Sequence, residues 1–434
     1  MRSQGMLVRS RSYQEKIAAL VIAAAFAAAT LPDTATAAGF RIENQSLAAI
    51  GLSAARVAHT PGPDASYYNP ANMGGLPDRW QVETSLTMLH LPSIAYDDHR
   101  NPAFNGGSDS ELFLMPLLHI ASPDYNGLRL GFSLTYPFGL AKQWSQPWPR
   151  GAAEEFSLTT VEANPTLSWQ VADWLSVGGG VRMVYGKGEV KNTLTNPPFA
   201  QLPPQTSLRN DSDASDTSLG YNLALSVRPT EAWTIAATYR SEVSLNLSGH
   251  GNLSGQAGPG SLPGYSGPAG LDLTLPAVLV LATSYTVGKL TVELVWDRTY
   301  WSALDTIDLN FGAGIAGFPH YAGFDQPLVK NWNNADAYRI GLTYVWDDHW
   351  TTTLGFSYDE TPVPTDTLGF ELPDADALVY CAGVRYRTTN DLEFGISYMY
   401  HHTRSQSVTN ANGIDGAFND GGAHAVTIGL ITTF

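Results

Sequence analysis

Cysteine and basic residues are scarce in this 434-residue chain. Its one cysteine, Cys381, excludes a disulfide framework, a cysteine-based zinc site and an iron–sulfur site within the chain. Lys and Arg number 24 against 40 Asp and Glu, and charged residues make up only 15% of the total. The formal charge is −16 without basic clusters, which argues against a nucleic-acid partner because phosphate neutralisation needs Lys and Arg.

Long apolar runs are missing after the amino terminus. No segment beyond residue 31 reaches 18 consecutive apolar residues, so we expect no membrane-spanning helix. The amino terminus itself has three parts. Residues 1–16 contain basic side chains, the apolar run Ile17–Leu31 follows, and Ala35-Thr36-Ala37 comes next. This order is typical of a secretory signal peptide, whereas a membrane anchor needs roughly 20 apolar residues. We predict a signal peptide over residues 1–37 and export from the cytoplasm.

Short alternating segments fill the rest of the chain. In one of them Leu392, Phe394 and Ile396 alternate with polar or small residues, a period of two that indicates a strand with one apolar face. Alternation bounded by turn residues predicts fourteen strands. They lie near 79–90, 111–121, 128–138, 155–171, 174–190, 215–228, 232–247, 271–287, 289–301, 335–346, 349–360, 375–388, 391–402 and 423–434.

The connections between these strands alternate in length. The even-numbered strands are followed by short turns, at 122–127, 172–173, 229–231, 288, 347–348 and 389–390. Several odd-numbered strands are followed by long loops, at 191–214, 248–270 and 302–334. A soluble sandwich has no reason to gather its long loops at one end, but an outer-membrane barrel does. The predicted fold is all-β, a 14-stranded antiparallel transmembrane β-barrel over residues 79–434.

Aromatic residues support a membrane setting. Tryptophans gather towards strand ends, as interface girdles require: Trp174, Trp233, Trp296, Trp301, Trp346 and Trp350. The chain ends in an alternating strand whose last residue is Phe434. By analogy, this terminal aromatic predicts recognition by the outer-membrane assembly machinery, and we expect contact with outer-membrane lipid and lipopolysaccharide. The expected location is the bacterial outer membrane.

Residues 38–78 precede the first strand and are too irregular to span a membrane. They are rich in Ala, Ser, Gly and Asn, but also carry Phe40, Ile42, Leu47 and Ile50. A fourteen-strand barrel leaves a lumen. We therefore expect this segment to fill the lumen as an N-terminal hatch; the competing interpretation is a disordered periplasmic tail.

Several motifs together resemble the FadL/TodX family of outer-membrane transporters. They are Gly39-Phe40, Asn69-Pro70-Ala71, Pro137-Phe138-Gly139-Leu140, Asp336–Gly341, Trp346–Trp350, Asp359–Pro364 and Leu372-Pro373-Asp374. The run from Asp336 to Asp374 is the most specific of these. The resemblance covers the whole chain after the signal peptide. It implies a fourteen-strand barrel with an N-terminal hatch that carries long-chain fatty acids or aromatic hydrocarbons across the outer membrane, with no cofactor and no enzymatic activity.

The resemblance also assigns candidate ligand contacts. Phe40 matches an aromatic residue beside the family's high-affinity site, although it serves equally well as an anchor for the hatch. Lys330 and Lys187 match family cations that contact a fatty-acid head group, as a buried carboxylate needs a partner. Strict alternation nevertheless places Lys187 on the lipid-facing side with Tyr185. Among lumen-phase arginines, Arg339 is a candidate contact, with pairing to carboxylates such as Glu293 as the alternative.

Two mechanical elements follow from the same resemblance. Asn69, Pro70 and Ala71 mark the end of the hatch and a gating region. In the family the third strand is kinked and opens the wall sideways. Pro137 removes a ladder donor and Gly139 weakens the strand, so the opening is expected at Pro137, Phe138 and Gly139. The alternative is an ordinary strand end.

Loops 191–214 and 248–270 are the expected capture surface. They carry Leu194, Phe199, Leu202, Leu253, Leu262 and Tyr265. Acidic residues 211–216 open like a calcium loop but lack its Gly and Glu, so an acidic loop tip is favoured over a divalent-ion site. The glycine-rich run 312–317 is not followed by the helix that a nucleotide site needs.

Transport by loop capture, lumenal binding, hatch movement and lateral release is the function predicted from the sequence, with long-chain fatty acids the favoured substrate. An aromatic-hydrocarbon channel of the same family stays open. A general porin for small polar solutes is a rival, but it needs no hatch. An outer-membrane hydrolase is a second rival, for which the chain carries no G-x-S-x-G elbow.

Overall fold

The structure is a computed structural model that describes residues 39–195, 205–388 and 391–434. The predicted signal peptide, Phe199, Leu202 and the turn at 389–390 therefore lie outside the described residues. Within these ranges, no helix is both long and apolar enough to cross a membrane.

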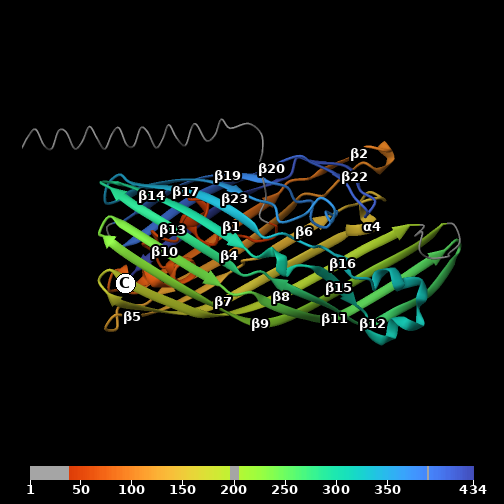
Figure 1. The fold of residues 1–434 in the computed structure, drawn as a ribbon, viewed down its shortest axis with the longest axis horizontal. Coiled ribbons are helices and arrows are strands. Elements are labelled where there is room, and N and C mark those ends of the chain that lie inside the picture. Colours follow the sequence, from red (N-terminus) through yellow and green to blue (C-terminus); the bar gives the residue numbers. More distant parts are fainter. Residues whose placement is uncertain (1–38, 196–204, 389–390) are drawn as a thin grey trace, which may run out of the picture.

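A closed antiparallel barrel of fourteen strand positions forms the body of the molecule (Figure 1). At three of these positions the strand is interrupted, so that two consecutive strands share the position. In order around the wall, the strands are β1 (Gln81–Leu91), β4 (Glu111–Ala121), β5 (Leu128–Thr135) with β6 (Gly139–Gln143), β7 (Glu155–Ala172), β8 (Leu175–Thr195), β9 (Thr206–Thr230), β10 (Trp233–Arg240) with β11 (Val243–Ala257), β12 (Gly260–Leu275) with β13 (Val278–Val287), β14 (Leu290–Thr299), β17 (Ala335–Val345), β18 (Trp350–Asp359), β19 (Ala377–Arg387), β20 (Leu392–Thr403) and β23 (Gly422–Thr433).

The first and last strands close the ring. β1 pairs with β23 from Gln81 opposite Thr433 to His90 opposite His424. Beyond the ladder, Trp80 and Phe434 exchange two backbone hydrogen bonds of 3.0 Å. Closure leaves no free sheet edge to expose backbone polar groups to lipid.

The strands alternate as the sequence predicts. On β9, for example, Leu219, Leu223 and Leu225 are exposed, while Asn222, Ala224 and Ser226 are buried on the inner face. Apolar side chains on the outside and polar ones within are the pattern of a barrel that crosses lipid.

Long hairpins extend from one end of the barrel and short turns join the strands at the other (Figure 1). The outer end also carries a small sheet of β2 (Ala95–Asp98), β3 (Gly106–Gly107), β21 (Gln406–Thr409) and β22 (Asp415–Asn419). The remaining outer elements are η2 (Pro102–Phe104), α4 (Arg150–Ala153), η3 (Trp301–Ala303), β15 (Thr306–Asn310), η4 (Gly312–Gly317), η5 (Pro319–Phe324) and β16 (Leu328–Val329).

Two predicted long loops are largely strand. β8 and β9 continue into 191–214, and β11 and β12 form a hairpin across 248–270. β11 also pairs with β9, from Ser248 opposite Ser215 to Ala257 opposite Thr206. Hydrogen bonding to a neighbouring hairpin supports these segments although their sequence lacks alternation, which is why the loop prediction was wrong there.

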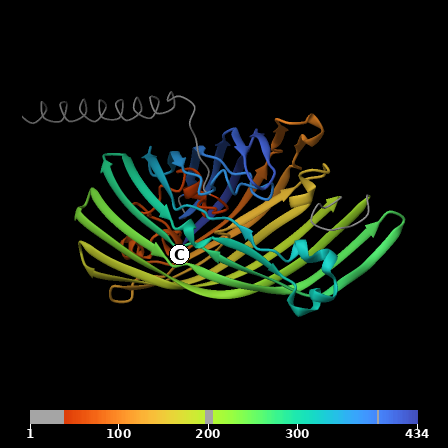
Figure 2. The same cartoon turned by 45° about the vertical axis from the view of Figure 1, so that its right-hand side comes forward.

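The N-terminal segment, residues 39–78, lies among the strands near the short-turn end (Figures 1 and 2, red and orange). It contains α2 (Leu47–Ile50), α3 (Ala65–Tyr68) and η1 (Pro70–Gly75). Close packing against the wall requires small residues: a Cβ on Gly178 of β8 would lie 2.6 Å from the Ala71 amide nitrogen. Buried Arg56 and Asp64 pair at 2.7 Å within the segment.

Candidate functional site

The barrel wall is interrupted between β4 and β6. The β4–β5 ladder covers only Leu118–Ala121 opposite Gly131–Leu134, and among the described pairings the rest of β4 pairs with β1 alone. β6 in turn pairs with β7. The Asp109 amide donates to the Gln143 carbonyl at 2.9 Å and closes the outer end of the gap. We call this gap the wall opening.

The predicted opening residues Pro137, Phe138 and Gly139 lie at this break. There the N-terminal segment replaces the missing strand partner: the Ile42 amide donates to the Pro137 carbonyl at 2.8 Å and the Gly139 amide to the Phe40 carbonyl at 2.9 Å. Buried backbone groups need such partners. Displacing Phe40 and Ile42 would therefore expose unpaired backbone at the opening.

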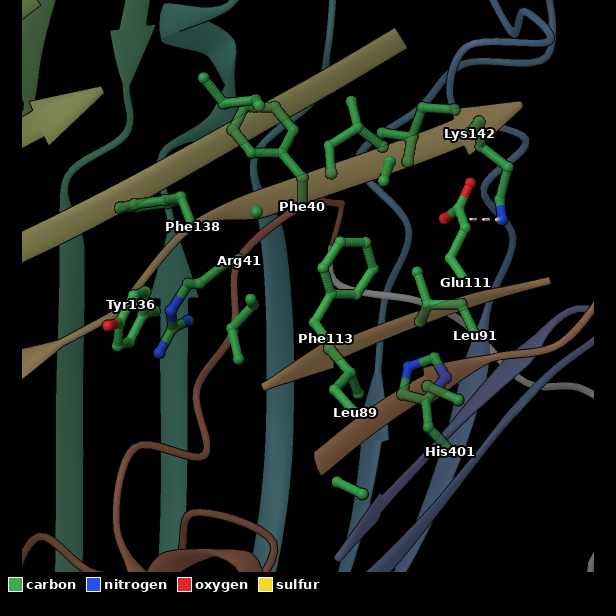
Figure 3. A pocket seen from close by; sticks show the side chains of 18 of the residues that line it. Phe40, Arg41, Leu89, Leu91, Glu111, Phe113, Tyr136, Phe138, Lys142 and His401 are labelled. Atoms are coloured by element: carbon green, nitrogen blue, oxygen red, sulfur yellow. Dashed lines mark ion pairs between the residues drawn. The ribbon is translucent and has the colours of Figure 1, made fainter. Parts of the chain in front are cut away.

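A cavity of about 570 Å³ adjoins the wall opening. Figure 3 shows Phe40, Phe113 and Leu91 around it. Its lining is mainly apolar and comes from the N-terminal segment, β1, β4, β6, β7, β20 and β23, including Phe40, Ile42, Leu89, Phe113, Met115, Leu140, Phe156 and Met399. The volume lies within the range of small-molecule sites, about 300–1,000 Å³. This cavity is the candidate functional site.

Phe40 lies at one wall of the cavity in an aromatic cluster. Its ring centroid is 4.7 Å from that of Trp301, 5.7 Å from Trp332 and 6.0 Å from Phe138. Trp301 was predicted as a membrane-girdle residue, but it is fully buried because its ring packs against those of Phe40 and Trp332. Phe40 therefore both lines the cavity and anchors the N-terminal segment.

Replacing Phe40 by alanine should loosen the start of the N-terminal segment. Loss of a buried Phe ring costs about 3–5 kcal/mol. Trypsin should then cleave faster after the neighbouring Arg41 in detergent-purified protein. Phe394→Ala, which removes an outward-facing ring that is 48% exposed, is the matched control and should leave cleavage unchanged. Equal cleavage rates in the two variants would contradict the anchoring role.

Arg339 lies in a buried charge network rather than on the cavity surface. Its guanidinium is 2.7 Å from Asp297 on β14, 3.2 Å from Asp359 on β18 and 3.5 Å from Glu43 of the N-terminal segment. Arg41 reaches the same Asp297 at 2.6 Å. The network thus ties the segment to three strands, β14, β17 and β18. Arg339 was predicted to contact the ligand, but its guanidinium is already paired with the carboxylates of this network.

Glu293 pairs differently from the prediction. Instead of an arginine side chain, it accepts hydrogen bonds from the backbone amides of Val57 and Ala58, each at 2.6 Å, and His59 at 3.1 Å. Arg182, which shares the lumen phase, pairs with Glu162 at 2.9 Å. Alternation along the strands predicted that Glu293 and Arg182 lie inside the barrel. It could not predict the partners of Glu293, because these come from the irregular N-terminal segment.

Lys330 and Lys187, the two lysines predicted to hold a head group, lie apart from each other and outside the cavity lining. Lys330 is buried near the aromatic cluster and forms an ion pair with Glu371. Lys187 faces outward on β8, where its half-exposed ammonium lies 2.5 Å from Glu189. Lys187 therefore lies on the outward face of β8 with Tyr185, as strict alternation predicts.

Asn69, Pro70 and Ala71 form the start of η1 against β8 and β9. The Asn69 side chain accepts from the Ala71 amide at 3.1 Å and donates to the Val57 carbonyl at 2.7 Å and to the Ser226 hydroxyl at 2.9 Å. These bonds fasten the end of the N-terminal segment to the wall.

The outer hairpins enclose a second apolar cluster. Leu253 and Tyr265 are buried there with Phe311 and Tyr321, and Leu194 packs against them. Acidic residues 211–216 lie on β9, where alternation divides them between two faces. Across the described parts of the chain, no group of three or more His, Cys, Asp or Glu is arranged to hold a metal ion.

Asp374 connects the loop after β18 to the N-terminal segment. It accepts from the Thr361 hydroxyl at 2.6 Å and from the Gly39 amide. Burial raises the pKa of Asp374 to about 7, and the same cause raises the pKa of Asp376 to about 6. The charged form of this loop carboxyl is thus disfavoured in the folded protein.

We expect the loop around Asp374 to loosen as pH rises. Its folded-state pKa exceeds the ordinary 3.8, so the folded form binds the proton more tightly and its stability falls between about pH 4 and pH 7. Protease digestion within residues 360–376 should be faster at pH 8 than at pH 5. Asp374→Asn should reduce this dependence; an unchanged pH dependence in the variant would contradict the assignment.

Lys142 and Glu111 were missed by sequence reasoning. They face each other at the edge of the cavity, with the Lys142 Nζ 3.8 Å from the Glu111 Oε2 (Figure 3). A signal existed: Lys142 follows the Pro-Phe-Gly-Leu motif by two residues, in the same phase as Leu140. Its partner was beyond reach because Glu111 comes from another strand.

Comparison with known proteins places this architecture in a family. In sequence, the chain is similar to long-chain fatty acid transport proteins of Escherichia coli, 25% identical over 330 residues covering 69% of this chain and 72% of the relative, and of Salmonella typhi, 24% identical over 313 residues covering 66% and 69%.

In fold, it is similar to a Pseudomonas aeruginosa FadL homologue, with a TM-score of 0.77, 21% identity and coverage of 92% of this chain and 99% of that one. It is also similar to the Pseudomonas putida toluene transporter TodX, with a TM-score of 0.72, 16% identity and coverage of 93% of this chain and 99% of that one. The family described as "Outer membrane protein transport protein (OMPP1/FadL/TodX)" matches residues 28–432. The chain therefore belongs to the OMPP1/FadL/TodX family of outer-membrane transport proteins.

Proposed function

We propose that this outer-membrane transporter of hydrophobic compounds takes up long-chain fatty acids and binds them in the cavity beside the wall opening. The observation that carries the proposal is the cavity itself, apolar along most of its lining and next to a break in the wall. Burial of an alkyl chain there is favourable by about 25 cal/mol per Å² removed from water. The names of the relatives in Escherichia coli and Salmonella typhi agree with this substrate class.

Residues 38–78 act as the hatch in this proposal. The described part is held by the Arg339 network, by the Glu293 carboxylate and by backbone pairing at the break. Movement of Phe40 away from Trp301 and Phe138 would join the cavity to the lumen. Bonds from Asn69 to the wall keep the far end of the hatch in place while its first residues move.

Lateral release follows from the position of the cavity. Ligand that enters between the outer hairpins reaches the aromatic cluster and then the cavity, whose outer side faces the gap between β4 and β6. Leu112 and Leu114, at the edge of the gap, are about 60% exposed toward lipid. An apolar ligand that leaves here passes from the apolar cavity into the lipid without crossing water.

In the outer membrane, we expect the protein to contact two further partners, lipopolysaccharide and the outer-membrane assembly machinery. Lipopolysaccharide surrounds the outer end, where the hairpins capture ligand. Phe434, 63% exposed at the end of the closing strand, offers a terminal aromatic to the outer-membrane assembly machinery. The signal peptide over residues 1–37 would deliver the chain to that machinery.

Equilibrium binding to detergent-purified protein tests the proposal. We expect saturable binding of oleate, one molecule per chain, and weaker binding of toluene. Preference for toluene would favour the second candidate, an aromatic-hydrocarbon channel, for which the rings of Phe40, Phe113 and Phe138 supply suitable contacts. Binding of neither compound, with rapid passage of small sugars into liposomes, would favour a general porin.

A further inference from the structure

Lys142 and Glu111 span the outer part of the wall opening. Lys142 lies on β6 and Glu111 is the first residue of β4, two strands that share no ladder among the described pairings. One residue beyond Lys142, the Gln143 carbonyl accepts from Asp109 and ends the gap. The ion pair is therefore at the outer rim of the opening, with its Nζ 3.8 Å from the Oε2 atom (Figure 3).

The pair is buried but incomplete. Only 7% of the Lys142 side chain and 10% of that of Glu111 are exposed. The separation is too long for a hydrogen bond, and the backbone amide of Gln143, rather than the Lys142 ammonium, donates to the Glu111 carboxylate. A buried charge pair is favourable only when its remaining hydrogen-bonding capacity is met. The arrangement thus leaves donors of Lys142 available to a third polar group.

Other cations near the cavity have their partners. Arg41 is the other lysine or arginine that lines it, and its guanidinium binds Asp297 at 2.6 Å and Thr299 at 2.8 Å. Lys330 is paired with Glu371 and does not line the cavity. Among the lysines and arginines that line the described cavity, Lys142 is therefore the one whose charged group forms no hydrogen bond to a carboxylate.

We propose that Lys142 binds the carboxylate of the fatty acid at the wall opening, and that Glu111 competes for the same ammonium group. The inference rests on the proposed function and names the head-group contact within that site. Glu111 balances the charge of Lys142 when no ligand is bound. When a carboxylate arrives, repulsion between it and Glu111 keeps the head-group site weak, which favours onward release.

This contact also sets the orientation of the ligand. Lys142 is at the outer rim, while Leu140, Phe40 and Met115 line the cavity further inward. A fatty acid held by Lys142 has its carboxylate outermost and its chain toward the apolar lining. Lipids of the outer leaflet have the same orientation, so the molecule can leave through the opening without turning over.

Two probes that differ in charge test the inference: oleate and oleyl alcohol, titrated into detergent-purified protein. Lys142→Gln should weaken oleate binding at least about tenfold and leave oleyl alcohol unchanged, because only oleate loses a charge-assisted bond. Lys142→Arg should retain oleate binding, and Glu111→Gln should tighten it. Lys187→Gln, which alters an outward-facing lysine, is the control and should match wild type.

The outcomes distinguish failure of the head-group role of Lys142 from failure of fatty-acid uptake itself. Unchanged oleate affinity in Lys142→Gln, or an equal loss for both probes, would overturn the head-group role and leave fatty-acid uptake intact. Failure of the wild-type protein to bind either probe would overturn the proposed function as well. Loss confined to oleate, restored by Lys142→Arg, supports the inference.

Discussion

Replacing Arg339 by methionine is expected to open the barrel to small polar solutes. The substitution leaves Asp297, Asp359 and Glu43 buried with much of their compensating charge gone. Breaking such a pair costs about 3–5 kcal/mol. Because Glu43 belongs to the N-terminal segment and the two aspartates to the wall, the cost falls on the docking of that segment.

Swelling of liposomes in a small sugar measures this effect. A loss of 3–5 kcal/mol raises the population of displaced segments by at least about a hundredfold, so swelling should accelerate markedly. Arg387→Met is the control, since that side chain is 58% exposed and its partner Glu393 keeps Arg385. If vesicles with Arg339→Met swell no faster than those with wild type, the network does not hold the segment against the barrel wall.

Filling the cavity from its far wall should abolish most ligand binding. Ala423 on β23 is buried and lines the cavity. A tryptophan there occupies volume that the ligand needs, so part of the alkyl chain stays unburied and loses about 25 cal/mol for each Å² that is not removed from water. We expect Ala423→Trp to lower oleate affinity at least about tenfold in equilibrium titration, since each 1.4 kcal/mol is a factor of about ten.

Ile428→Trp provides the matched comparison on the same strand. Ile428 is 55% exposed on the outer face, so the added ring enters lipid or detergent instead of the cavity. Its oleate affinity should equal that of wild type. Equal affinities in Ala423→Trp and wild type would show that oleate binds elsewhere.

Much of the barrel was predictable from the sequence because lipid imposes a strict alternation on each crossing strand. The predicted segment at 111–121 agrees with β4, and 391–402 lies within one residue of β20. That constraint ends beyond the membrane. Ser254, Gly255 and Gln256 show no alternation, yet they lie on β11 because a neighbouring hairpin supplies their hydrogen bonds.

The site was less predictable because its contacts join distant parts of the chain. The Pro137–Gly139 motif marked the break, but the partners of Pro137 and Gly139 come from residues 40–42. Lys330 was predicted from its match to a family cation, and nothing in that match indicated Glu371 as its partner. Lys142 and Glu111 come from two different strands, and only the folded barrel shows that these strands lie beside each other there.

Locating a bound fatty acid would show whether the cavity beside the wall opening is the binding site. Crystals of the protein grown with a fatty acid brominated near its methyl end would locate the chain by anomalous scattering. We expect bromine in the cavity among Phe40, Met115 and Leu140, beside the wall opening. Bromine only at the periplasmic end, among His59, Trp174 and Arg228, would contradict it.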